Sequence, residues 1–247
     1  MRPLHIIMPM AGEGSRFLNK GYKIPKPLIT FKGKALFERA ISSVESINAT
    51  KKFSFIVRQE HIDEYRIDKK VKDSIPQANI FSVKKTTRGA VETCLVAKDN
   101  IDINDAILIM DCDLEFKCHK YDEALTAILN KRIEDVDGGL LVSFNASEPR
   151  YSYAEIDGNY NVIRTAEKEV ISDHALCGAY FFSKAEGFLT SANELLHETD
   201  FSKPELYVSL LYNYLLKKRE NVKLVVADKY YSYGTPEELK RCESYFR

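Results

Sequence analysis

The opening of the chain constrains its fold more than any other stretch. An apolar run of strand length, residues 6–10, stops at a loop in which Gly12 and Gly14 carry no side chain. Backbone N–H groups in such a loop can turn inward and cradle an anion. We therefore expect the first strand to end beside a bound anionic group.

Two cations follow this glycine loop closely. Arg16 lies just past Gly14, and Lys26 stands between two prolines whose fixed φ angles restrict where the backbone can point. An amide-lined loop with two cations beside it suits a triphosphate. The candidate nucleotide contacts in this stretch are Met10, Ala11, Gly12, Gly14, Ser15, Arg16 and Lys26.

The spacing within the loop excludes two common phosphate-binding motifs. Phe17 takes the place of the third glycine of G-x-G-x-x-G, and the Gly-Lys-Ser/Thr ending of a P-loop is absent. A tight turn followed by a solvated basic loop is the structural alternative.

Composition limits the class of protein and its partners. The 247 residues are 45% hydrophobic, enough for one large α/β domain, and 36 basic residues balance 36 acidic ones. A net charge of zero gives no sign of a nucleic-acid or membrane partner. The five cysteines form no C-x-x-C pair, so we expect reduced thiols. We expect no cleaved leader and no membrane span, and hence a cytoplasmic protein.

Apolar periodicity predicts alternating strands and helices. After the first strand, further strands are predicted at 53–57, 79–83, 106–110, 140–144, 175–182 and 222–226. Helices are predicted at 36–47, 60–75, 121–132, 184–196 and 204–218, with a short one after Gly89 and a last one after Thr235. This rhythm implies a mostly parallel sheet with helices packed on it.

Two acids end the strand at 106–110. Asp111 and Asp113 would lie at the carboxyl end of a parallel strand, where open sheets bind their ligands. Two residues apart in extended chain, their side chains point the same way. One or both can hold Mg²⁺, which binds through one or two carboxylates and completes its shell with waters and substrate phosphates. Solvated carboxylates at a polar strand end are the alternative.

The rhythm changes after Ser147. Residues 151–156 and 161–163 are predicted to form an antiparallel hairpin around an Asp-Gly-Asn turn. A hairpin inserted at this point is where a second substrate would be recognised.

The G-x-G-S-R loop followed by P-K-P-L resembles the signature loop of the nucleotidyltransferases that activate sugar 1-phosphates, the nucleoside-diphosphate-sugar pyrophosphorylases. The resemblance implies a Rossmann-like, three-layer α/β/α fold of the GT-A-like type, with a mostly parallel mixed sheet and an inserted β-hairpin. It also implies a single nucleotidyltransferase domain over residues 1–247. Its nucleotide-binding half would be 1–145, and its acceptor-binding half, with the C-terminal helices, 146–247.

The same resemblance assigns roles on the nucleotide side. Asp113 corresponds to the metal ligand of the family, with Asp111 as second choice. Gly89 would let the nucleobase approach the backbone, with Arg88 beside it as a further contact. A simple helix-entry turn is the alternative for Gly89.

On the acceptor side, the family shows an E-K pair followed by G-x-Y/F, which Glu167-Lys168 and Gly178-Ala179-Tyr180 match. The resemblance implies that Lys168 contacts the acceptor phosphate and that Gly178 lets the acceptor lie against the strand. Tyr180 and Tyr153 would line the acceptor site. A surface ion pair is the alternative for Glu167-Lys168.

One position departs from the family pattern. The family usually reads W/F-x-D-x-G-T-P-E, where the Asp is a second metal ligand, and this chain has Ser232 there. Helix capping by itself also explains the string, because Thr235 is suited to the N-cap, Pro236 to N1 and Glu238 to N3 of a capping box. The candidate replacements for the missing ligand are Asp111, Asp228 and Glu115, or water together with Ser232.

The resemblance implies an enzyme that joins a nucleoside triphosphate to a phosphorylated acceptor, most commonly a sugar 1-phosphate, and releases pyrophosphate with the help of Mg²⁺. Arg16, Lys26 and Asp113 would be its catalytic residues. An acceptor phosphate is largely dianionic near pH 7, so it would attack without a general base. The histidines are scattered along the sequence and suggest no such base, in agreement with this expectation.

Three other functions remain open on the sequence. One is a cytidylyltransferase acting on a non-sugar phosphate or phosphonate, such as choline phosphate or an amino-acid phosphate. Another is a GT-A glycosyltransferase that uses Asp111-x-Asp113 as its metal site, and the third is a nucleotide-binding protein without turnover. The sequence leaves a homo-oligomer open as well.

Overall fold

The computed structural model describes residues 2–131, 136–198 and 205–245. Within them lies a nine-stranded sheet with the main order β10-β9-β11-β6-β1-β4-β5, in which β8 pairs with β11 and β12 with β8. These strands are β1 (Leu4–Met10), β4 (Lys51–Arg58), β5 (Asn79–Val83), β6 (Ala106–Met110), β8 (Gly139–Asn145), β9 (Ser152–Ile156), β10 (Val162–Glu167), β11 (His174–Phe182) and β12 (Val222–Val226).

The sheet has a parallel part and an antiparallel part. β1 runs parallel to β4 and β6, with Leu4 opposite Lys51 and Ala106, and β4 runs parallel to β5. β11 runs antiparallel to β6, β8 and β9, and β9 and β10 form the hairpin expected from the sequence. The mixed sheet and the inserted hairpin are therefore confirmed.

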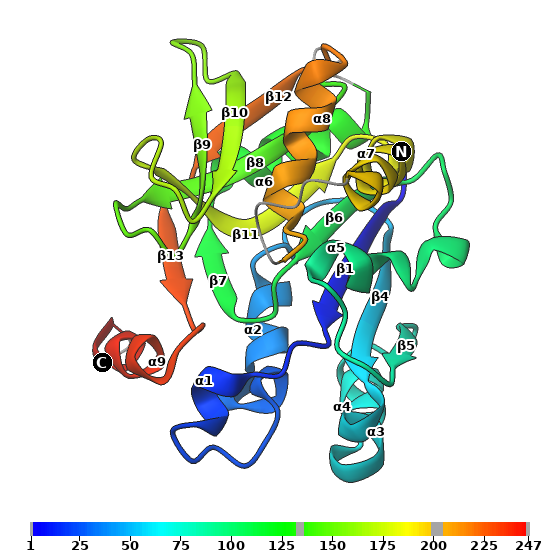
Figure 1. Ribbon diagram of the computed structural model, residues 1–247, viewed down its shortest axis with the longest axis vertical. Coiled ribbons are helices and arrows are strands. Elements are labelled where there is room, and N and C mark those ends of the chain that lie inside the picture. The colour runs from blue at the N-terminus through cyan, green and yellow to red at the C-terminus, as the bar shows by residue number, and fades with distance from the viewer. Residues whose placement is uncertain (1, 132–135, 199–204, 246–247) are drawn as a thin grey trace.

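Helices cover both faces of the sheet (Figure 1). They are α1 (Ser15–Leu18), α2 (Leu36–Ser42), α3 (Gln59–Tyr65), α4 (Ile67–Ser74), α5 (Ala90–Leu95), α6 (His119–Leu129), α7 (Ala185–His197), α8 (Leu211–Lys217) and α9 (Pro236–Tyr245), with 3₁₀ turns η1 (Lys26–Leu28), η2 (Lys98–Asn100) and η3 (Val208–Leu210). Alternate residues of β1 face opposite ways: Ile6 packs in a core with α2, α4 and α6, whereas Ile7 packs with α5, α7 and α8. Three layers result, as expected.

Two small sheets were not expected from the sequence. One is β2 (Thr30–Phe31) with β3 (Lys34–Ala35). The other pairs β7 (Leu114–Lys117) with β13 (Lys229–Ser232), directly after the end of β6. The Tyr233 N–H then donates to the Asp113 carbonyl at 2.7 Å, so the segment leading into α9 is tied to the end of β6.

Several predicted helices differ from the observed ones. The helix predicted at 60–75 is two helices, because Arg66 adopts φ 53° between them. Ile62 and Val71, on either side of this break, pack in the same core, which is why one continuous helix was predicted. The helix predicted at 36–47 ends at Ser42. The helix predicted at 204–218 begins only at Leu211, because the main chain of Leu206 instead forms hydrogen bonds with the turn before α5. Residue 204, the first of the predicted helix, lies outside the described part.

The helix predicted at 121–132 ends at Leu129, and residue 132 also lies outside the described part. None of the helices formed by the described residues is long and apolar enough to cross a membrane.

Candidate active site

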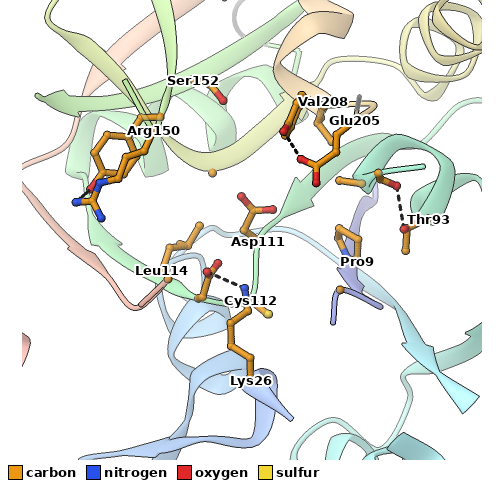
Figure 2. Close-up of a pocket in the computed structure, with 18 of the residues that line it drawn as sticks. Pro9, Lys26, Thr93, Asp111, Cys112, Leu114, Arg150, Ser152, Glu205 and Val208 are labelled. Atoms are coloured by element: carbon orange, nitrogen blue, oxygen red, sulfur yellow. Dashed lines mark hydrogen bonds and ion pairs between the residues drawn. The ribbon is translucent and has the colours of Figure 1, made fainter. Parts of the chain in front are cut away.

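A cavity of about 620 Å³ opens at the carboxyl ends of β1 and β6 (Figure 2). The glycine loop, the turn before α5, residues 111–114 and the hairpin side of the sheet all contribute to its lining. The predicted site residues that line it are Ala11, Gly12, Gly14, Ser15, Arg16, Lys26, Arg88, Gly89, Asp111, Asp113, Glu167, Lys168, Gly178 and Tyr180. Segments that are far apart in the sequence therefore meet at the carboxyl ends of β1 and β6, the place where the sequence predicts a ligand site.

The glycine loop turns sharply between β1 and α1. Gly14 adopts φ 65°, a left-handed conformation that glycine tolerates best, and its carbonyl accepts hydrogen bonds from the amides of Phe17 and Leu18. A Cβ at Gly14 would lie 3.4 Å from the Cβ of Lys26. The glycine loop and the P-K-P segment are thus packed against each other.

Lys26 and Asp113 form an ion pair inside the cavity. The Lys26 Nζ lies 2.9 Å from Asp113 Oδ2, and both side chains are mostly buried. Burial alone would lower the pKa of Lys26, but the charges of Asp113 and its neighbours raise this pKa above its ordinary value. Lys26 therefore stays protonated. Because its ammonium and the Asp113 carboxylate are in direct contact, one phosphate group could reach both side chains.

Asp111 is partly buried beside this pair and faces the cavity (Figure 2). Its backbone N–H donates to the Gly178 carbonyl at 2.9 Å. Gly178 adopts φ 83°, and a Cβ there would lie 2.7 Å from Asp111 Oδ2, so only glycine leaves room for this carboxylate. Burial, followed by repulsion from Asp113, raises the pKa of Asp111 to about 7.

The donor set of this region suits Mg²⁺. Among the described residues no side chain donates a hydrogen bond to the Asp111 carboxylate, which leaves a partly buried carboxylate beside Asp113 without a partner. The described residues contain no group of three metal-binding side chains. Two carboxylates are nevertheless what Mg²⁺ uses when substrate phosphates complete its shell.

The turn before α5 is held by a segment from the far end of the chain. We call residues 205–208 the crossing segment. The Leu206 N–H donates to the Arg88 carbonyl at 2.8 Å, and the Val91 N–H donates to the Leu206 carbonyl at 3.1 Å. Gly89 adopts φ 144°, and a Cβ there would lie 2.5 Å from the Leu206 nitrogen. Close backbone packing therefore requires this glycine, whereas Arg88 turns to pair with Glu92.

Lys168 projects into the cavity from the end of the hairpin. It adopts φ 57°, an uncommon conformation for a residue with a side chain, and its N–H donates to the Tyr151 carbonyl at 3.0 Å. Its ammonium donates to the Tyr207 hydroxyl and lies 3.6 Å from a Glu205 oxygen. The neighbouring Glu167 accepts hydrogen bonds from Ser152 and Ser209 and is almost fully buried.

The sequence reasoning missed a second charged group on the hairpin side. Arg150 pairs with Glu238 at 2.9 Å and with Glu148 at 2.9 Å, and its guanidinium lies over the Tyr151 ring. Arg150, Tyr151 and Glu238 all line the cavity. The Glu238 N–H donates to the Thr235 hydroxyl, which is half of the expected capping box, but the Glu238 carboxylate turns to Arg150 and Tyr151.

Ser232 lies in the cavity lining, close to Asp113. A Cβ at Gly234 would lie 3.2 Å from Asp113 Oδ2, 3.2 Å from Glu238 Oε2 and 3.7 Å from Ser232 Oγ. Three oxygen atoms therefore surround one space that glycine leaves free. Ser232 therefore lies beside the metal-ligand candidate Asp113, with a smaller and uncharged side chain where the family pattern has aspartate.

Other candidates lie outside the cavity lining, which corrects the expectations for them. Tyr153 is fully buried and its hydroxyl donates to the Glu148 carbonyl, so it does not line the acceptor site. Asp228 accepts a hydrogen bond from the His119 N–H at the start of α6, and Glu115 is held by Arg39 and Tyr233. Neither acid lies in the cavity lining with Ser232 and Asp113. The Met10 side chain packs in the core.

Known proteins have a similar fold. The structure is similar to that of a nucleoside-diphosphate-sugar pyrophosphorylase from Vibrio cholerae RC9, with a TM-score of 0.80, 28% identity and coverage of 96% of this chain and 98% of that one. A candidate glucose-1-phosphate thymidylyltransferase from Bacillus anthracis, solved with a sucrose, has a TM-score of 0.75, 16% identity and coverage of 98% and 94%. The inositol-1-phosphate CTP transferase from T. maritima has a TM-score of 0.71 and 14% identity, with coverage of 95% of this chain and 90% of that one.

No curated protein matches the chain. The family model described as nucleotidyl transferase, in contrast, matches residues 4–241. With nearly its whole length matched, the chain belongs to the nucleotidyl transferase family and is a nucleotidyltransferase.

Proposed function

We propose that this nucleotidyltransferase joins a nucleoside triphosphate to a sugar 1-phosphate and releases pyrophosphate. The observation that carries the proposal is the 2.9 Å pair of Lys26 and Asp113 in one cavity between the glycine loop and the hairpin. The proposal treats residues 1–247 as one domain, in which 1–145 binds the nucleotide and 146–247 binds the acceptor.

The triphosphate would lie along the glycine loop. Gly12 and Gly14 line this side of the cavity, where backbone amides would hold the phosphates, and Arg16 would take the β and γ oxygens and stabilise the departing pyrophosphate. Lys26 would contact the α-phosphate as charge builds there. The nucleobase would lie by Gly89 and Arg88, where the turn before α5 meets the crossing segment.

Asp113 and Asp111 would hold Mg²⁺, with Ser232 and water on its open side. When bound, the ion would neutralise phosphate charge and so relieve the repulsion between the two substrates. Asp111 fits this role because its carboxylate faces the cavity without a partner among the described residues. Asp113 would exchange Lys26 for the ion, which frees the lysine for the substrate.

The acceptor would lie between β11 and the hairpin. Lys168 would contact its phosphate. Glu167 would accept hydrogen bonds from its hydroxyl groups and Tyr180 would donate to them, while Gly178 leaves room beside Asp111. The name of the 28%-identical Vibrio cholerae structure supports a sugar as the rest of this acceptor.

The chemistry needs positions and charges rather than a proton acceptor. A phosphate oxygen of the acceptor attacks the α-phosphorus in line, the new P–O bond forms, and the bond to the β-phosphate oxygen breaks with its electron pair leaving on pyrophosphate. Because the acceptor phosphate is mostly dianionic near pH 7, no group must take a proton from it. Catalysis therefore rests on orientation and on neutralising charge.

The test is a pyrophosphate-release screen of CTP, UTP, dTTP, GTP and ATP against sugar 1-phosphates, choline phosphate and amino-acid phosphates, with and without Mg²⁺. We expect release with one sugar 1-phosphate and its loss when EDTA is present. Release only with a non-sugar phosphate would replace the sugar by that acceptor. No release with any pair would contradict the proposal.

A further inference from the structure

Lys168 carries its ammonium on a long, flexible side chain. The backbone is held, since the Lys168 N–H donates to the Tyr151 carbonyl, but the side chain is 49% exposed. An unrestrained lysine side chain occupies many rotamers, and binding an anion costs it that freedom. Contacts that restrict the ammonium before a ligand arrives therefore improve the binding of that ligand.

Two side chains of the crossing segment lie at this ammonium. The ammonium donates a hydrogen bond to the Tyr207 hydroxyl and lies 4.8 Å from the centre of the Tyr207 ring. The nearest Glu205 oxygen is 3.6 Å away, which is too far for a hydrogen bond. Among the described residues, the Tyr207 hydroxyl is therefore the one group that accepts a hydrogen bond from the Lys168 side chain.

Tyr207 is itself held in place. Its neighbour Leu206 makes two backbone hydrogen bonds to the turn before α5, and the Leu206 side chain is buried. Tyr207 has extended backbone and lines the cavity, as does Glu205 on the other side of Leu206. The Tyr207 hydroxyl donates to Glu205. Burial and this hydrogen bond raise the pKa of Tyr207, so the hydroxyl stays neutral.

The contact between Lys168 and Tyr207 can persist when an anion binds. An ammonium has several N–H donors, and the hydrogen bond to Tyr207 leaves others free for a ligand. Because the hydroxyl is neutral, it does not repel a phosphate. Tyr207 can therefore fix the direction of the ammonium both before and after the phosphate arrives.

We propose that Tyr207 is a positioning residue, whose hydroxyl holds the Lys168 ammonium where the acceptor's phosphate binds. This inference rests on the proposed function, because it takes Lys168 as the phosphate contact. Tyr207 acts through Lys168 and makes no contact of its own with the phosphate. Since Leu206 ties the crossing segment to the turn before α5, the cation of the acceptor side is positioned from the nucleotide side of the cavity.

The first test titrates phenyl phosphate, a simple phosphate monoester, into the full chain by calorimetry. Tyr207→Phe removes the hydroxyl and keeps the ring. We expect the Kd to rise about 2- to 10-fold, the cost of immobilising one additional side chain. Tyr160→Phe is the matched control, with the same change at an exposed tyrosine of the hairpin turn, and should keep the wild-type Kd. An unchanged Kd in Tyr207→Phe, or an equal rise in both variants, would overturn the positioning role.

Lys168→Met distinguishes positioning from direct contact. If Tyr207 acts through Lys168, adding Tyr207→Phe to Lys168→Met should weaken binding no further. An equal loss with and without Lys168 would overturn the inference, because Tyr207 would then contact the phosphate itself. Phenyl phosphate binding that is absent from the wild type, or unchanged in Lys168→Met, would overturn the acceptor site of the proposed function as well. Weaker binding in Lys168→Met with wild-type binding in Tyr207→Phe would overturn the role of Tyr207 alone.

The order of the lysine side chain gives a second readout, which needs no ligand. NMR relaxation of the Lys168 Cε group, assigned by the signal that disappears in Lys168→Met, reports how far this side chain moves in the free protein. We expect its order parameter to fall in Tyr207→Phe and to stay at the wild-type value in Tyr160→Phe. An order parameter unchanged in Tyr207→Phe would overturn the inference, even if that variant bound phenyl phosphate more weakly.

Discussion

The two walls of the cavity use charge in different ways. The nucleotide wall offers backbone amides of the glycine loop and Arg16, whose guanidinium has no partner among the described residues. The acceptor wall offers Arg150 and Lys168, each held by carboxylates, together with hydroxyl groups of tyrosine and serine. The first arrangement would attract any polyphosphate, whereas in the second an anion would compete with carboxylates for the cations. Affinity for anions is therefore expected mainly from the first wall.

The difference follows from the sheet. The nucleotide wall is formed where parallel strands end together, so that β1 and β6 present main-chain groups and the Asp111-x-Asp113 acids at one edge. The acceptor wall is formed by β9, β10 and β11, which run antiparallel and present side chains along their length.

The largest effect should come from the nucleotide wall. We expect Lys26→Ala to lower turnover by ~10²-fold or more, the loss typical of one transition-state donor, with the fold intact. Steady-state pyrophosphate release and thermal unfolding measure the two quantities. Lys23→Ala, at an exposed lysine three residues away, is the control and should keep wild-type turnover. Near wild-type turnover in Lys26→Ala would remove this lysine from the mechanism.

The junction of the two walls should respond next. Gly89→Ala places a Cβ 2.5 Å from the Leu206 nitrogen at a φ of 144°, so we expect a loss of about 2 kcal/mol in the free energy of unfolding and a raised KM for the nucleotide. Denaturant unfolding and initial rates check both. Gly158→Ala, in the open hairpin turn with no atom within 4 Å of the added Cβ, should change neither. Equal stability of the two variants would contradict the close packing.

The smallest effect should come from restoring the missing charge. Ser232→Asp puts a carboxylate beside Asp113, and we expect the Mg²⁺ concentration for half-maximal activity to fall by about 3- to 10-fold. Direct binding of Mn²⁺, followed by electron paramagnetic resonance, gives a readout independent of turnover. Ser232→Asn, which adds the size without the charge, should not tighten binding. If both variants bind the ion equally, charge at this position is irrelevant.

Much of the fold could be predicted because its signals are local. The strands at 79–83, 106–110 and 222–226 match their predicted bounds, since each is a short run between polar or turn residues. The glycine loop, Lys26 and the two acids also line one cavity as expected, because parallel strand ends meet at one edge of a sheet. Their roles in binding and catalysis stay predictions.

What could not be predicted depends on distant partners. Glu238 was read from its position in a capping box, but its carboxylate is drawn to Arg150, 88 positions earlier in the chain. Tyr207 was placed in a helix because its neighbours have helical spacing, and the pairing of Leu206 with Arg88 overrides that preference. Asp228 accepts a hydrogen bond from the backbone at the start of α6 and lies outside the cavity lining. No local pattern reports such pairings.

The pairing of β7 with β13 has a consequence for the order in which the molecule is completed. The Asp113 carbonyl accepts its hydrogen bond from the Tyr233 N–H, so the catalytic candidate is held by a segment that follows every strand of the large sheet in the chain. A nascent chain that has emerged as far as β12 already contains every strand of the large sheet. It still lacks the Tyr233 hydrogen bond and the glycine that leaves space beside Asp113, Gly234. The strands of the large sheet are therefore synthesised before the segment that holds the catalytic candidate in place.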